Sequence, residues 1–254
     1  SHYKIVIIND DSYDMLVNDK QFTKRHARAV KAMMPLVDNV INVEPRVAAY
    51  NQQKYKKGIF FPIICDDVIA KKRLERVLPI SQNYVSKYRL EGKKVLLFVG
   101  RLVALKNVEF ALRAFIKAKL DNTVFVIVGS GPEEEKLHKI AAGNPAVIFT
   151  GRLEGDKLYA WYNVGQVFTL PSYQEPFGAV TNEALVAGCK VLISKEAGSN
   201  CLVKDGENGY IIDPHDEKSF IEKLKLAFYN IKPLEMPLVV KENMMISSFD
   251  EHIK

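Results

Sequence analysis

From residue 93 onward, short runs rich in Val, Ile and Phe alternate with segments whose apolar residues recur at helical spacing. The runs are typical of parallel strands buried on both faces, and the segments between them are typical of the helices that cover such a sheet. The sequence therefore predicts an α/β fold with about five βα units in one Rossmann-like domain. The expected strands are 94–99, 123–128, 146–150, 167–170 and 190–194, and the expected helices are 107–119, 133–142, 156–162 and 178–187.

The elements predicted in the first 92 residues do not make up a complete domain. Buried strands are predicted at 4–8, 40–43 and 58–64, with one helix at 23–33. These strands are too few for a complete doubly wound sheet. We therefore predict two domains, residues 1–92 and 93–254, of which the first is the later part of a larger Rossmann-like domain.

Composition excludes several classes of protein. With 254 residues, 48% of them hydrophobic and 26% charged, the chain is long enough to bury the core of one large or two modest globular domains. Its 3 cysteines are too few and too scattered for a disulfide framework or a zinc site. The longest apolar run, 59–65, is far shorter than the roughly 18 residues of a membrane span. Without a secretory signal either, we expect a cytoplasmic protein.

Charge distinguishes the two halves. Residues 1–92 hold 16 Lys and Arg against 10 Asp and Glu, whereas residues 93–254 hold 20 against 20. The clusters Lys54/Lys56/Lys57 and Lys71/Lys72/Arg73/Arg76 could face anionic lipid at the inner side of a membrane or a phosphate-bearing substrate, and a solvated helix or loop face explains them equally well. Nucleic acid is disfavoured because no aromatic residues interleave with these clusters.

Three glycine-bearing turns follow predicted strands. They are Gly100-Arg101, Gly129-Ser130-Gly131 and Gly151-Arg152, and the carboxyl ends of strands are where open α/β sheets bind ligands. The second turn begins like a dinucleotide motif, but its third glycine position is Glu134, which disfavours an NAD oxidoreductase. In the first turn, Arg101 and the nearby Lys106 precede a helix, a combination suited to binding a diphosphate. Ordinary surface charge is the alternative for these two residues.

The segment 171–188 adds two carboxylates around the start of a helix. Glu175 lies in the loop after a strand, and Glu183 lies within the helix that follows. Fully helical spacing would separate them by about 12 Å, which is roughly the reach from the sugar to the ribose of a nucleoside diphospho-sugar. A glutamate near a helix start also interacts favourably with the helix dipole, so the pair is compatible with a purely structural role.

Together these residues resemble the donor-binding domain of retaining glycosyltransferase family 4, whose members have the two-domain GT-B fold. Glu175 and Glu183 match the family's E-x7-E pair. The similarity runs from about residue 93 to 220 and is carried, in order, by VLLFVGRLVALKN, FVIVGSGPEEEKL, VIFTGRLEGDKLYAWY, PSYQEPFGAVTNEALVAG and VKDGENGYIIDPHD. On this resemblance, residues 1–92 are the later part of the acceptor-side domain, and residues 93–254 bind the nucleotide-sugar.

The resemblance also implies roles for individual residues. Arg101 and Lys106 would neutralise the donor diphosphate, Glu183 would bind the ribose hydroxyls, and Glu175 would contact the sugar. The amides of Phe177, Gly178 and Ala179 would contact sugar and phosphate; the nucleoside pocket would be lined by Gly100, Gly129, Ser130, Gly131, Arg152 and Leu153. Cations and oriented N–H groups would stabilise the departing diphosphate without a bound metal.

We therefore expect a hexosyltransferase of polysaccharide biosynthesis that uses a UDP- or GDP-sugar and a glycan or lipid-linked acceptor. The alternative is a nucleotide-sugar-binding module without catalysis, because the acceptor side is incomplete in residues 1–92. A sugar-nucleotide epimerase of the same fold is disfavoured by the E-x7-E pair.

Overall fold

A parallel sheet of six strands forms the centre of the larger part of the molecule in the computed structural model, which describes residues 4–11, 13, 16, 24–248 and 251. The strand order is β6-β5-β4-β7-β8-β9, and every pairing is parallel. Because β4 comes first in the chain, the order reverses between β4 and β7. The strands are β4 (Lys94–Val99), β5 (Thr123–Val128), β6 (Val147–Gly151), β7 (Val167–Leu170), β8 (Lys190–Ser194) and β9 (Gly209–Ile212).

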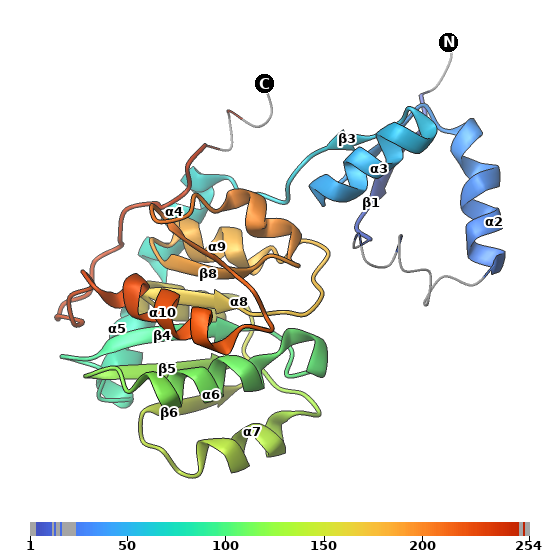
Figure 1. The fold of residues 1–254 in the computed structure, drawn as a ribbon. Helices are drawn as coiled ribbons and strands as arrows, with labels where there is room; N and C mark the ends of the chain where they lie inside the picture. The colour runs from blue at the N-terminus through green and yellow to red at the C-terminus, as the bar shows by residue number, and fades with distance from the viewer. Residues whose placement is uncertain (1–3, 12, 14–15, 17–23, 249–250, 252–254) are drawn as a thin grey trace.

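Helices cover both faces of this sheet (Figure 1). On one face, α6 packs beside α7 and α10, and on the other α8 packs beside α4 and α5, while α9 contacts α4. The central strands are largely apolar because helices cover both of their faces, and in β5 all six residues are buried. The helices are α6 (Val108–Ala118), α7 (Glu134–Ala141), α8 (Gly155–Val164), α9 (Val180–Val186) and α10 (Glu217–Phe228).

The expected α/β fold is thus confirmed, and four strands have the expected bounds. After β8 the structure adds two elements that the hydrophobic pattern did not predict. Strand β9 has only four residues, and helix α10 follows it after a turn. Asp216 caps the start of α10, because its Oδ1 accepts from the Ser219 N–H at 2.9 Å.

A smaller parallel sheet lies in the first 60 residues, in the order β1-β2-β3. The strands are β1 (Val6–Asn9), β2 (Asn39–Asn42) and β3 (Ile59–Phe60), with helices α2 (Lys24–Met33) and α3 (Pro45–Tyr55). The strand expected at 58–64 shrinks to two residues because its partner β2 ends at Asn42 and Pro62 has no N–H to donate. Residue 23, the expected first residue of the helix, lies outside the described residues.

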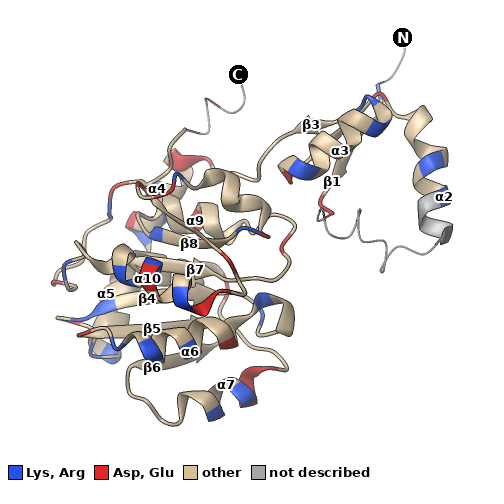
Figure 2. Ribbon diagram, viewed as in Figure 1, with Lys and Arg blue, Asp and Glu red and all other residues tan. Residues whose placement is uncertain are grey.

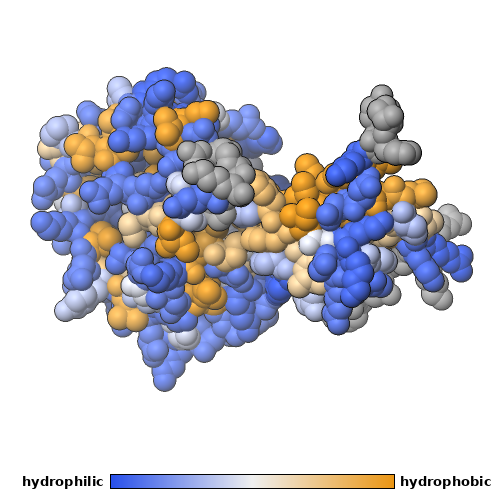
Figure 3. All heavy atoms as spheres, turned by 90° about the horizontal axis from the view of Figure 1, so that it is seen from above, coloured by the Kyte–Doolittle hydropathy of each residue, from blue (hydrophilic) through white to orange (hydrophobic). Residues whose placement is uncertain are grey.

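Apolar side chains remain exposed on this small unit (Figure 3). Ile8 on β1 is 72% exposed and Leu36 73%, and Ile59 and Phe60 on β3 are exposed as well. The described part of the chain therefore leaves one face of the small sheet uncovered.

Two further helices, α4 (Asp67–Arg76) and α5 (Leu78–Lys87), precede residue 92 but pack on the larger unit. Leu74 and Val85 belong to the core of the six-stranded sheet, and the Tyr84 ring stacks on Trp161 with centroids 4.6 Å apart. Helices α4 and α5 therefore pack as part of the larger unit. The domain boundary at residue 92 stays a prediction.

The basic cluster on α4 is partly paired within the protein. Asp156 accepts from Arg73 Nε at 3.4 Å and from Arg76 Nη2 at 2.7 Å. Lys71 and Lys72 are exposed and form no ion pair within the described residues. Acidic and basic residues are interspersed over the larger unit (Figure 2). Among the helices of the described residues, none is long and apolar enough to cross a bilayer.

Candidate functional site

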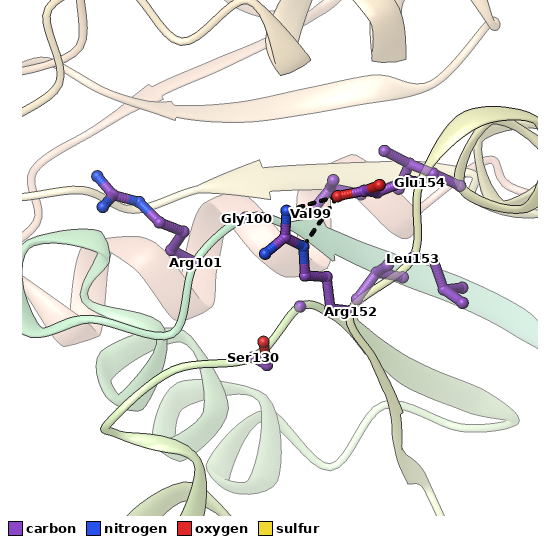
Figure 4. Close-up of a pocket in the computed structure, with 10 residues that line it drawn as sticks. Val99, Gly100, Arg101, Ser130, Arg152, Leu153 and Glu154 are labelled. Atoms are coloured by element: carbon purple, nitrogen blue, oxygen red, sulfur yellow. Dashed lines mark hydrogen bonds and ion pairs between the residues drawn. The ribbon is translucent and has the colours of Figure 1, made fainter.

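A cavity of about 360 Å³ lies at the carboxyl ends of β4, β5 and β6 (Figure 4). This edge of the sheet adjoins the reversal of strand order between β4 and β7, where open α/β sheets bind their ligands. The cavity is lined by Val99, Gly100, Arg101, Val128, Gly129, Ser130, Arg152, Leu153, Glu154 and Leu158. The structure therefore brings together six of the residues that the sequence assigns to the nucleoside and diphosphate, from three separate turns.

Close backbone contacts between these turns explain their glycines. The Gly129 N–H donates to Gly151 O at 2.9 Å, and a Cβ at position 129 would lie 1.9 Å from Gly100 O. A Cβ at position 131 would lie 2.4 Å from Leu102 O. Glycine at 129 and 131 thus lets two loops pack against each other, and Gly131, unlike Gly129, does not line the cavity.

The two arginines of the cavity differ in their partners. Arg152 Nε donates to Glu154 Oε1 at 3.0 Å, whereas the Arg101 side chain points away from that pair (Figure 4). Arg101 is exposed and forms no ion pair within the described residues. Arg101 is therefore the cation of this cavity that is available to an incoming anion.

Lys106 and Glu175, 69 positions apart, form a largely buried ion pair. Lys106 ends the short 3₁₀ helix η2 (Ala104–Lys106), and Glu175 lies in the loop after β7. Their side chains are 18% and 11% exposed. The backbone of Glu175 is held on both sides, since its N–H donates to Glu196 O at 3.3 Å and its carbonyl accepts from Gly198 N at 3.1 Å. Two of the three residues predicted to be catalytic, Lys106 and Glu175, are therefore in direct contact, whereas the third, Arg101, is not part of this ion pair.

The segment from Phe177 to Ala179 connects this point to α9. Phe177 is 2% exposed and packs in the core. Gly178 has a φ of +89°, and a Cβ there would lie 2.6 Å from the Leu170 side chain. A glycine is required at position 178 by both conformation and space.

Glu183 lies apart from the cavity lining, in a buried polar cluster between α8, α9 and α4. The Tyr162 hydroxyl donates to Glu183 Oε2 at 2.7 Å. Burial raises the pKa of the Glu183 carboxyl above its ordinary value, while the Tyr162 hydrogen bond and the charge of Arg73 act to lower that pKa. Sequence reasoning missed Tyr162, because a tyrosine in an apolar helical segment is typical of core packing. The structure relates Tyr162 to the cavity through Leu158, which lies one turn earlier on α8 and lines the cavity.

No group of three or more His, Cys, Asp or Glu side chains is placed to hold a metal ion in the part of the chain that the structure describes. Whether donor binding is independent of metal stays a prediction.

The family model for "Glycosyl transferases group 1" matches residues 81–240, more than half of the chain. The chain belongs to the group 1 glycosyl transferases. The match covers the six-stranded sheet together with most of α5, and it includes the cavity and the Lys106–Glu175 pair. It also confirms the general part of the resemblance seen in the sequence.

Curated relatives of this group 1 chain carry transferase names. The sulfoquinovosyl transferase SQD2 of Arabidopsis thaliana is 32% identical over 147 residues, which are 57% of this chain and 28% of that protein. A D-inositol 3-phosphate glycosyltransferase of Acidothermus cellulolyticus is 35% identical over 136 residues, 48% of this chain and 30% of that protein. The match thus spans less than a third of either relative.

The fold has solved counterparts. The crystal structure of Anabaena HepE in complex with UDP superposes with a TM-score of 0.74 at 18% identity, covering 89% of this chain and 64% of that one. At this identity the likeness establishes the fold alone.

Proposed function

We propose that this group 1 chain binds a nucleoside diphospho-sugar, with UDP or GDP as the nucleotide, at the cavity formed by β4, β5 and β6. The observation that carries the proposal is the meeting of three glycine turns at this cavity, with an available guanidinium on its wall. The UDP bound in the solved HepE structure and the transferase names of the curated relatives support it.

In this proposal the parts of the donor have separate contacts. The nucleoside occupies the cavity, Arg101 and Lys106 face the diphosphate, Glu175 contacts the sugar and Glu183 accepts hydrogen bonds from the ribose hydroxyls. Negative charge develops on the diphosphate as the anomeric bond breaks, so cations fixed beside it stabilise the transition state without a metal. The whole protein would transfer a hexose with retention, as in family 4, to a glycan or lipid-linked acceptor.

One observation favours a second candidate, a binding module without catalysis. Lys106 is already paired with Glu175, so its ammonium would have to leave that carboxylate to bind a diphosphate. Acceptor-dependent release of nucleoside diphosphate would establish transfer, whereas donor binding without release would favour the binding module.

The variant Glu183→Gln tests the proposed donor site. We expect roughly ten- to a hundredfold weaker binding of UDP or GDP, because a carboxylate that accepts from ribose hydroxyls contributes about 1.5–3 kcal/mol. Calorimetric titration measures the affinity, and the exposed Glu135→Gln on α7 is the control, with an expected affinity equal to that of the unaltered chain. If both variants bind UDP or GDP with the same affinity, Glu183 has a purely structural role.

A further inference from the structure

One of the two oxygens of the Glu183 carboxylate accepts a hydrogen bond within the described residues. Tyr162, which is fully buried, donates its hydroxyl to Oε2 at 2.7 Å, and within the described residues no group donates to Oε1. A carboxylate with one oxygen fixed retains a second oxygen with full capacity to accept hydrogen bonds. Glu183 is therefore oriented by the protein and still has an acceptor to offer.

Three further titratable groups face Glu183 from the elements around it. These are Tyr159 on α8, Arg73 on α4 and Cys65 in the segment that connects the two units. The Arg73 guanidinium lies 3.8 Å from the centroid of the Tyr159 ring, and the Cys65 N–H donates to Asn182 Oδ1 at 2.6 Å. Tyr162 is the group that hydrogen bonds to the carboxylate directly.

The same helix connects this cluster to the cavity. Leu158, one turn before Tyr162 on α8, lines the cavity wall. Residues four apart project from the same side of a helix, so this side of α8 both forms the nucleoside cavity and holds the carboxylate.

We propose that Tyr162 is a positioning residue for donor binding: its hydroxyl fixes Glu183 Oε2 and so presents Oε1 to the hydroxyl groups of a ribose. This role rests on the proposed function, since it needs a nucleotide in the cavity. Fixing the rotamer before the ligand arrives reduces the entropy lost on binding. Tyr162 makes no contact with the donor itself in this account.

The hydrogen bond from the tyrosine also favours the ionised form of the carboxylate. Burial raises the pKa of Glu183, and the hydrogen bond from Tyr162 opposes that rise because it stabilises the charged form. Without the hydroxyl the pKa rises further, so Glu183 takes up its proton at a higher pH. Because a protonated carboxyl accepts from ribose hydroxyls less well, nucleotide affinity falls as pH falls, and the fall begins at a higher pH in Tyr162→Phe.

The test compares Tyr162→Phe with the matched control Tyr159→Phe, which removes from the same cluster a hydroxyl that does not hydrogen bond to Glu183. Calorimetric titrations with UDP, GDP and inorganic pyrophosphate are run between pH 5.5 and 8. For Tyr162→Phe we expect roughly fivefold to tenfold weaker binding of the nucleotide. We also expect a pH profile moved upward, unchanged pyrophosphate affinity and no further loss when Tyr162→Phe is added to Glu183→Gln.

Other outcomes would overturn the role. Nucleotide affinity and pH profile equal to those of the unaltered chain would do so, as would an equal loss for nucleotide and pyrophosphate, which indicates general damage to the site. If the unaltered chain binds neither UDP nor GDP, the proposed function itself fails. Binding by the unaltered chain with no effect of Tyr162→Phe overturns the positioning role alone.

Discussion

Replacing Lys106 by Met is expected to lower the free energy of unfolding by about 3–5 kcal/mol, because the Glu175 carboxylate would remain buried without its cation. The Glu175 side chain is only 11% exposed, and the backbone that carries it is hydrogen bonded on both sides, so the carboxylate has little access to water in place of its cation. Chemical denaturation followed by circular dichroism measures the change. The double variant Lys106→Met/Glu175→Gln should recover most of the loss, since it removes the unpaired charge.

A surface pair provides the comparison for this effect. Lys117 and Glu217 form an ion pair at 2.5 Å with side chains 59% and 33% exposed. Lys117→Met should therefore lower the free energy of unfolding by no more than about 1 kcal/mol. If Lys106→Met and Lys117→Met lower the free energy of unfolding equally, the ion pair between Lys106 and Glu175 does not behave as a buried ion pair.

The second large effect is expected at Arg101. We expect Arg101→Ala to weaken binding of UDP or GDP roughly ten- to a hundredfold, since a hydrogen bond to a charged group contributes about 1.5–3 kcal/mol. The guanidinium lies on the cavity wall without an ion-pair partner among the described residues, so the diphosphate would not have to displace a carboxylate. Calorimetric titration measures the affinity.

Arg152 is the matched control, because it lines the same cavity but is paired with Glu154. Arg152→Ala should change the affinity by a smaller factor. A larger loss for Arg152→Ala than for Arg101→Ala would place the diphosphate on the other side of the cavity.

The strands of the larger sheet could be predicted because they are buried on both faces and so read as uninterrupted apolar runs, as in 94–99 and 123–128. The grouping of the glycine turns could also be predicted, since parallel strands place their carboxyl ends at one edge. Helices α4 and α5 could not be predicted from the sequence. Their polar faces carry Lys71, Lys72 and Gln82, and their apolar faces are recognisable only against the core on which they pack.

The side-chain partners at the site required the fold. Nothing in the spacing of Lys106 and Glu175 shows that the loops after β4 and β7 bring them into contact, because β4 and β7 are neighbours only through the reversal of strand order. The hydrogen bond from Tyr162 to Glu183 likewise depends on where the fold places α8 and α9, both of which contact α4. Sequence patterns identified both glutamates, and tertiary packing determines what each one contacts.

Ligand-dependent melting of the chain tests most directly whether the cavity is a nucleotide-sugar site. UDP, GDP, ADP, their sugar conjugates and NAD are each added at 100 times their dissociation constant, or at the highest soluble concentration, with and without EDTA. We predict that UDP or GDP and the matching nucleotide-sugar stabilise the protein by about 2.7 kcal/mol at that excess, that EDTA changes nothing, and that NAD has no effect. Stabilisation by NAD with none by any nucleoside diphosphate would contradict this prediction.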